Sequence, residues 1–582
     1  MTDSTTTALP RTLGELVDAL AAGSGALAVY DRRGKTKVER PYPEVARRAR
    51  AWGAWLEAQG VRPGDLVYLC LPTSHELIEG FLGASLVGAL PCCLALPRAI
   101  GGLDVFRRRV EQLARFGRGH LVTTPEVGAE LGAPFLAPPD PLDLERLVDV
   151  PRLDPGAIAY VQLTSGSTSV PKAVAITHAN LAANTAAIYT RGAGSPAETY
   201  VSWLPLYHDM GLVGILFTAM FHGCSLALMT PETFVGTPRR WFEAMTDVRK
   251  DHTIVTSAPN FGYQWAVDRI PAEKVAGLDL SRWRVACCGA EMVRPATLEE
   301  FAARFRPAGF DPGALIPCYG MAEATLAVTM SPAARGPVVV DGSVSCGPAV
   351  DGLEVTIRPV DGAPERARAG LADLPESGPG GGGSPGEVGE RSRRTHHTED
   401  SDETLPEGTE GEIVIRGSSV FPGYFLDPEA TAAVLHDGLF RTGDLGYLRG
   451  GELHVTGRVK DLIILDGANV APHELEWLAQ AHVDLDGGRA AAFSVEHRRR
   501  EVPVLVVEVK EVPPPEAVEA LRAAVARDVA PLHDLVFVRR GTVPKTSSGK
   551  VQRGQVRARY LDGTLEGVLW RWAQATAEGG EA

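Results

Sequence analysis

The chain has 582 residues, 45% of them hydrophobic and 22% charged, and its formal net charge is −14 at pH 7. The length exceeds what one hydrophobic core ordinarily supports, so two or more domains are expected, and the composition is typical of a folded protein. The negative charge argues against a general nucleic-acid binder, whereas an anionic substrate stays compatible with it because the field of a site can oppose the net charge.

The eight cysteines show neither a CxxC spacing nor a cluster with histidine. Cys92 and Cys93 are adjacent within an apolar run, as are Cys287 and Cys288, which predicts buried, reduced thiols and a cytoplasmic location. The first residues lack a basic-then-apolar signal pattern. Apolar segments such as 82–96 are interrupted by Gly or Pro well before about 18 residues, so no membrane span is expected.

Helical and strand patterns alternate along the N-terminal part. Residues 42–59 and 76–87 have apolar or alanine residues at helical spacing, and each pattern leads into a strand-like run, VYLCLP and LPCCLALP. The alternation returns after residue 180, and it predicts an α/β domain with a parallel sheet and covering helices. The later helical segments are 180–189, 241–251 and 296–305, and the strand-like ones are 199–205, 253–259, 283–288 and 314–319.

Residues 361–407 break this pattern, because they contain GPGGGGSPGE and ERSRRTHHTEDSDE with almost no large apolar residues. Such a composition predicts a disordered insert between two strands of one domain. A metal site at His396 and His397 is the alternative, and a solvated loop is favoured because no ordered partner is near in sequence.

The remaining residues predict more β structure and then a separate block. EGEIVIRG is strand-like, 437–448 is a turn-rich β segment, and ELHVTGRVKDLII crosses into the last part. That part has the size of a small α+β domain. Its predicted helices are 472–481 and 516–529, and its predicted strands are 502–509 and 535–538.

The segment LTSGSTSVPKAV, residues 163–174, predicts a polyphosphate-binding loop. Small residues let backbone N–H groups approach an oxyanion, hydroxyls add donors, and Lys172 adds a mobile positive charge. It is not a Walker A loop, because the second glycine and the Ser or Thr after the lysine are missing. A Ser/Gly surface turn is the alternative. The predicted phosphate-binding residues are Thr164, Ser165, Gly166, Ser167, Thr168 and Lys172.

This loop resembles the phosphate loop of the adenylate-forming (AMP-binding) superfamily, and Ser169, where many members carry Gly, resembles the fatty acyl-AMP ligase branch. Further signatures follow in the order of the family, over roughly residues 13–559. The resemblance implies an α/β fold with a large N-terminal domain, residues 1–457, and a small mobile α+β C-terminal domain, residues 458–582. It also implies ATP and Mg²⁺ as ligands.

PLYHDMG, residues 205–211, resembles the segment that borders the acyl pocket of the family. The resemblance implies that His208 lies beside the substrate carboxylate and that Met210 and Gly211 lie on the pocket wall. The alternative for His208 is a structural histidine.

CCGAEMV and YGMAEAT resemble the two segments around adenine. Tyr319 offers an aromatic face, and Glu323 is an oxygen ligand suited to Mg²⁺, although a glutamate in the first turn of a helix would also be favourable there. The implied nucleotide-site residues are Gly289, Ala290, Glu291, Tyr319, Gly320, Met321, Ala322 and Glu323.

Three C-terminal signatures complete the resemblance. Asp444 in RTGDLG would accept the ribose hydroxyls, although Gly-Asp turns are common, and Arg458 in GRVKDLII would contact the ribose and phosphate side. Lys460 matches the interdomain hinge. Lys550 in PKTSSGKVQR matches the catalytic lysine, with a solvated surface lysine as the alternative.

This set suits the attack of a carboxylate on the α-phosphorus of ATP. Both groups are anionic, so alignment and fixed positive charge lower the barrier. We expect acyl-AMP formation from an apolar acid, since residues 203–261 are rich in Leu, Met, Phe and Trp, and then transfer to the phosphopantetheine thiol of an acyl carrier protein.

Two alternatives stay open. A carboxylate–CoA ligase shares the first half-reaction, and the stretch between Met330 and Cys346 is too short for the insertion that acyl-AMP ligases usually carry, so the acceptor is undecided. A catalytically dead scaffold that binds a carrier protein is the other, and the joint presence of the signature residues argues against it.

Overall fold

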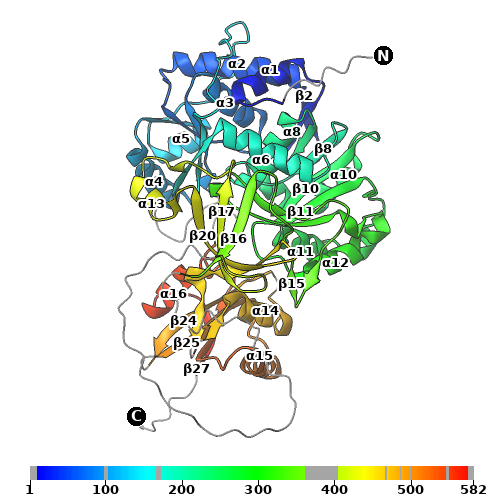
Figure 1. The fold of residues 1–582 in the computed structure, drawn as a ribbon, viewed down its shortest axis with the longest axis vertical. Coiled ribbons are helices and arrows are strands. Elements are labelled where there is room, and N and C mark those ends of the chain that lie inside the picture. The colour runs from blue at the N-terminus through cyan, green and yellow to red at the C-terminus, as the bar shows by residue number, and fades with distance from the viewer. Residues whose placement is uncertain are drawn as a thin grey trace.

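The computed structural model describes residues 9–97, 102–164, 172–360, 404–465, 468–485, 487–497, 500–545 and 550–573. Ser165, Gly166, Ser167 and Thr168 of the predicted phosphate loop lie outside these ranges, as does nearly all of the predicted insert, residues 361–403 with His396 and His397. Figure 1 shows a larger N-terminal part and, below it, a smaller C-terminal part in orange and red.

The N-terminal part is built on an eight-stranded sheet with the order β13-β12-β11-β10-β8-β9-β1-β2. The six inner strands are parallel, and β2 and β13 run antiparallel at the edges, which confirms the predicted parallel sheet. The strands are β1 (Ala26–Tyr30), β2 (Lys37–Pro41), β8 (Glu198–Ser202), β9 (Ser225–Leu228), β10 (Thr253–Pro259), β11 (Trp283–Gly289), β12 (Leu315–Gly320) and β13 (Ala327–Met330).

Helices connect these strands, as crossovers between parallel strands require. The predicted helices 42–59, 76–87, 180–189 and 296–305 are all present almost as expected. The predicted helix 241–251 is instead α10, Arg239–Thr246, and its last residues form a turn in which Arg249 pairs with Asp251 at 2.8 Å. Longer helices between the strands include α6 (His178–Arg191), α12 (Pro295–Phe305) and α11 (Asn260–Arg269), the last of which the sequence analysis did not predict.

A second parallel sheet, β4-β3-β5, comes from the first 130 residues. Its strands are β3 (Leu66–Cys70), β4 (Leu90–Cys93) and β5 (Gly119–Thr123), and α2 (Tyr42–Ala58) packs on α3 (His75–Leu86) beside it. The two helices approach closely at Gly83, where an added Cβ would lie 2.7 Å from Trp52 Cβ and 2.8 Å from Ala49 O. Glycine is therefore needed for this helix packing.

Two antiparallel sheets position the segments around the site. β6 (Ile158–Leu163) and β7 (Ala173–Thr177) flank the phosphate loop, and β18 (Gly423–Tyr424) pairs with β7. The other sheet joins β16 (Leu353–Arg358), β17 (Gly411–Gly417), β20 (Leu439–Arg449) and β21 (Glu452–Arg458), with the short β19 (Leu435–His436) at its edge.

The C-terminal domain has its own hydrophobic clusters, which begin at Ile463 and are separate from the N-terminal core. It is an α+β unit as predicted, but the sequence analysis did not identify the two edge strands of its four-stranded sheet, β24 and β27, or the helix α16. Its elements are α14 (Pro472–His482), α15 (Pro515–Asp528), α16 (Arg553–Leu561), β24 (Ala490–His497), β25 (Arg500–Val509), β26 (Asp534–Arg539) and β27 (Val568–Ala573).

The burial of the cysteines and the length of the helices agree with what the sequence predicts. All eight cysteines are free of disulfides, and seven are buried, while Cys318 is partly exposed. In the part of the chain that the structure describes, no helix is long and apolar enough to cross a membrane.

Candidate active site

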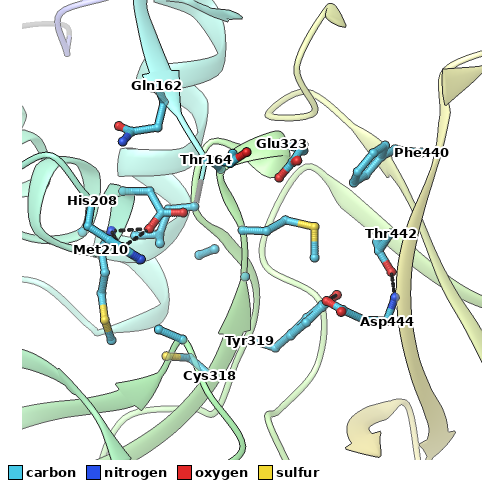
Figure 2. A pocket seen from close by; sticks show the side chains of 18 of the residues that line it. Gln162, Thr164, His208, Met210, Cys318, Tyr319, Glu323, Phe440, Thr442 and Asp444 are labelled. Carbon is cyan, nitrogen blue, oxygen red and sulfur yellow. Dashed lines mark hydrogen bonds and ion pairs between the residues drawn. The ribbon is translucent and has the colours of Figure 1, made fainter. Parts of the chain in front are cut away.

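One cavity of about 1180 Å³ brings together residues from both domains. Figure 2 shows His208 and Met210 on one side of it and Thr442 and Asp444 on the other. The predicted site residues that line the cavity are Thr164, Lys172, His208, Met210, Ala290, Tyr319, Gly320, Met321, Ala322, Glu323, Asp444, Arg458, Lys460 and Lys550.

Tyr319, Asp444 and Arg458 form a hydrogen-bonded group in this cavity. The Tyr319 hydroxyl donates to Asp444 Oδ2 at 2.8 Å, and Arg458 Nε lies 2.9 Å from Asp444 Oδ1. Burial and the neighbouring carboxylate raise the pKa of Tyr319, so its hydroxyl stays a donor. Each carboxylate oxygen has a second lone pair, so Asp444 keeps capacity to accept hydrogen bonds from a diol.

The backbone around Asp444 explains why a Thr-Gly-Asp sequence stands there. Thr442 Oγ1 donates to Ile413 O at 2.7 Å and accepts from Asp444 N at 3.0 Å. Gly443 has φ +71°, a left-handed conformation that glycine adopts without strain, and its N–H donates to Glu412 Oε1 at 3.0 Å. The turn thus fixes the direction of the Asp444 side chain.

Glu323 accepts a hydrogen bond from a tyrosine whose ring also contacts a lysine. The Tyr424 hydroxyl donates to Glu323 Oε1 at 3.0 Å, and Lys172 Nζ lies 4.4 Å from the centre of the Tyr424 ring. Burial raises the pKa of Glu323, while Lys172 acts in the opposite direction. A cation at this carboxylate would stabilise its ionised form, and one carboxylate plus substrate phosphates is a common donor set for Mg²⁺. The residues present therefore fit Mg²⁺.

His208 is oriented by the next residue in the chain. Asp209 is 7% exposed, its Oδ1 lies 2.6 Å from His208 Nδ1, and it also accepts from Met210 N at 2.7 Å. Burial alone would raise the pKa of Asp209, but the hydrogen bond from His208 and the charge of Lys550 outweigh it and hold this pKa below its usual range. Asp209 therefore fixes the imidazole and adds negative charge behind it.

Lys550 lines the cavity from the C-terminal domain, together with neighbouring residues such as Gln552 and Arg553. Burial lowers the pKa of Lys550 and Arg458 lowers it further, whereas Asp209, Asp444 and Glu291 act in the opposite direction. The ammonium group thus faces carboxylates of the N-terminal domain across the cavity.

The cavity also has apolar lining residues, which suit an acyl group. Gly214 belongs to it and lies in a π-helical turn, Leu212–Phe217, an arrangement often found at functional sites. The apolar lining residues include Ile188, Tyr200, Ile215, Val255, Leu326 and Met330.

Three predicted site residues do not line the cavity. A Cβ at Gly289 would lie 2.6 Å from Cys318 O, so glycine is needed there for strand packing. Glu291 lies behind the wall, where its Oε1 accepts from Phe261 N at 2.5 Å. Gly211 also lies behind it, because a Cβ there would come within 2.4 Å of Pro205 O.

Comparisons with known proteins agree with this fold. The protein-family profile described as AMP-binding enzyme matches residues 19–96 and 111–370. A Caulobacter vibrioides protein provisionally named acyl-CoA synthetase is 33% identical over 95% of this chain and 96% of its own length. A Moorena producens medium-chain-fatty-acid–acyl-carrier-protein ligase is 32% identical over 90% of both chains.

A solved structure from a study of fatty acyl-adenylate ligases of E. coli and L. pneumophila has a TM-score of 0.81 at 30% identity, and covers 95% of this chain and 98% of that chain. The chain therefore belongs to the AMP-binding family of adenylate-forming enzymes. Within it, the chain is an acyl-adenylate-forming ligase similar to fatty acyl-AMP ligases, and it activates a carboxylic acid with ATP. This confirms the predicted family, fold class and enzyme class.

Proposed function

We propose that this ligase activates a fatty or other apolar carboxylic acid as acyl-AMP and then transfers the acyl group to the phosphopantetheine thiol of an acyl carrier protein. The observation that carries the proposal is that Lys550 shares one cavity with His208, the Tyr319–Asp444–Arg458 group and a set of apolar residues. That arrangement supports a role for Lys550 as a mobile cation that acts on both the acyl group and the nucleotide.

In the first step a carboxylate oxygen of the acid attacks the α-phosphorus of ATP, and the bond from that phosphorus to the bridging oxygen breaks. Pyrophosphate leaves with the electron pair. Lys550 neutralises charge on the carboxylate and the α-phosphate, and His208, held by Asp209, orients the acid. The Thr164–Lys172 loop receives the pyrophosphate, with Ser165, Gly166, Ser167 and Thr168 as its further donors.

The nucleotide is held by the remaining residues. Asp444 and Arg458 bind the ribose, Tyr319 lies against adenine, and the backbone of Gly320, Met321 and Ala322 completes the wall beside Ala290. Glu323 holds Mg²⁺, which supplies charge neutralisation to the phosphates when bound.

The second step depends on movement of the C-terminal domain. We assign residues 1–457 to the N-terminal domain and 458–582 to the mobile domain, with Lys460 as the hinge. Arg458 is the last residue of β21, so the hinge follows directly after the N-terminal sheet, and two observations support a hinge at Lys460. Lys460 lies in a 3-10 turn, Val459–Asp461, and the C-terminal hydrophobic cluster begins two residues after that turn, at Ile463. A hinge of a few residues between two separate cores is typical of domain rotation.

The carrier-protein acceptor is favoured over coenzyme A by the ligase-type motifs and by the Moorena producens relative, while the Caulobacter vibrioides relative favours coenzyme A. The short segment after Met330 forms only a small hairpin, β14 (Val339–Val340) and β15 (Ser343–Val344). The test is ATP–pyrophosphate exchange over a panel of acids, followed by product analysis with coenzyme A or a phosphopantetheinylated carrier protein. Efficient acyl-CoA formation would mean that coenzyme A, and not a carrier protein, is the acceptor of the acyl group.

A further inference from the structure

The segment that follows β11 touches the cavity at one end and the C-terminal domain at the other. Ala290 lines the cavity. Four residues later, the Arg294 guanidinium donates to Gln480 Oε1 and lies over the ring of Trp477, with its central carbon 5.2 Å from the ring centroid. Trp477 and Gln480 both belong to α14, so Arg294 joins the wall of the nucleotide site to this helix.

The N-terminal domain holds this segment firmly. Arg294 N donates to Asn260 Oδ1 at 3.0 Å, and Glu291 Oε1 accepts from Phe261 N at 2.5 Å. Both partners lie at the start of α11, and Arg294 directly precedes α12, at its N-cap position. The backbone of Arg294 is therefore fixed, so its side chain presents a fixed attachment point to the other domain.

On the other side of the contact, α14 is linked to the segment that carries Lys550. Glu476, the residue before Trp477, accepts from Arg553 Nε at 2.6 Å and from Arg553 Nη2 at 2.7 Å. Arg553 also lies 3.2 Å from Asp461 and stands three residues after Lys550. A two-pronged, largely buried ion pair is directional, so the position of α14 sets the position of this segment.

We propose that Arg294 is a positioning residue for adenylation, which holds α14 and, through the Glu476–Arg553 pair, places Lys550 in the cavity. The inference rests on the proposed role of Lys550. Arginine suits this task because its planar group stacks on an indole and donates a hydrogen bond at the same time. A lysine could supply the charge but not both contacts.

The kinetic test compares Arg294→Ala and Arg294→Lys with wild type in ATP–pyrophosphate exchange. We expect Arg294→Ala to lower kcat about ten-fold, in line with the loss of a cation–π contact and a hydrogen bond, with the KM values for ATP and acid little changed. The kcat of Arg294→Lys should lie between those of Arg294→Ala and the wild type. The matched control is Arg522→Ala, which removes a cation–π contact to Trp572 at 3.6 Å within the C-terminal domain and should keep wild-type kcat.

A double-mutant cycle with Gln480→Ala tests the contact itself. Gln480 is exposed, so its removal leaves the cores of both domains intact. The double variant should lose no more kcat than Arg294→Ala alone, because both changes break the same contact. Fully additive losses would overturn the assignment, as would a wild-type kcat in Arg294→Ala.

A second readout needs no substrate and so stands apart from the proposed function. Lysine acylation by a small activated ester, followed by mass spectrometry, reports the accessibility of each amine. Arg294→Ala should increase the labelling rate of Lys550 several-fold and leave Lys250, whose side chain is 78% exposed, unchanged. Equal labelling of Lys550 in both proteins would overturn the inference. A wild type that exchanges pyrophosphate with none of the acids would instead overturn the proposed function.

Discussion

Arg458 and Asp444 face each other as a register pair on the antiparallel strands β21 and β20, with Arg458 Nε 2.9 Å from Asp444 Oδ1. This pairing is set by the hairpin and not by a ligand, so the arginine is positioned before a nucleotide binds. The same carboxylate accepts from Tyr319 at 2.8 Å, which ties the hairpin to the end of β12. A preformed polar group of this kind reduces the reorganisation that substrate binding requires.

Replacing Asp444 should therefore affect the nucleotide much more than the acid. Asp444→Ala removes the acceptor for the ribose and the partner of Arg458, and should lower kcat/KM for ATP by about ten- to a hundred-fold. Asp444→Asn keeps an acceptor and should lose less. Steady-state kinetics with ATP and the acid varied in turn measures the effect of each variant on each substrate separately. Equal effects on ATP and acid would mean that the turn has only a structural role.

Lys550→Ala should reduce pyrophosphate exchange by about two to three orders of magnitude while the Kd for ATP changes little, because the lysine acts mainly on charge that develops in the transition state. Lys545→Ala is the matched control, since this lysine lies on the same segment but does not line the cavity. Exchange at the wild-type rate in Lys550→Ala would contradict the assigned role.

Glu323 and Tyr424 make a prediction about the metal. Tyr424→Phe removes the hydroxyl that donates to Glu323 Oε1 at 3.0 Å, and should raise the Mg²⁺ concentration for half-maximal exchange about ten-fold. Glu323→Gln removes the negative charge and should raise this Mg²⁺ concentration further. Titration of exchange activity with Mg²⁺ at saturating ATP measures both effects. An unchanged Mg²⁺ requirement in Glu323→Gln would place the metal elsewhere.

The sequence predicted the elements and the motif residues because both depend on local patterns. Strands such as 253–259 and helices such as 472–481 follow from apolar spacing, and the cavity residues follow from short signatures in a fixed order. Tyr424 could not be found in this way, because its contact with Glu323 joins positions 101 residues apart. The role of Asp209 could have been predicted from the sequence, because Asp209 follows His208 directly in PLYHDMG and a carboxylate there can pair with the imidazole.

The three predicted site residues that do not line the cavity share a physical feature. Gly289, Glu291 and Gly211 stand within signature segments, and sequence alone does not tell which residue of such a segment faces the cavity and which packs behind it. At Gly289 the carbonyl of Cys318 is too close for a Cβ, and at Gly211 the carbonyl of Pro205 in the same segment is too close, so packing and not ligand access requires both glycines. The contact of Arg294 with α14 was equally out of reach, since it depends on how the two domains meet.

His178 should make the protein less stable in acid. It is 4% exposed at the start of α6, its Nδ1 accepts from Leu13 N at 3.3 Å, and burial lowers its pKa from 6.5 to about 4, against the opposing charges of Asp154 and Glu15. Well above pH 6.5 the histidine is neutral in both the folded and the unfolded chain. As the pH falls from 6.5 towards 4, the unfolded chain binds a proton that the folded chain excludes. The free energy of unfolding therefore decreases, by up to about 3 kcal/mol at pH 4.

The variant His178→Asn tests this prediction, because it keeps an acceptor near Leu13 N and removes the titration. Urea unfolding at pH 7 and pH 5 should therefore show a smaller loss of stability in His178→Asn than in wild type, while the other buried histidines contribute equally to both proteins. An identical loss in the two proteins would mean that His178 takes up its proton without disturbing the fold.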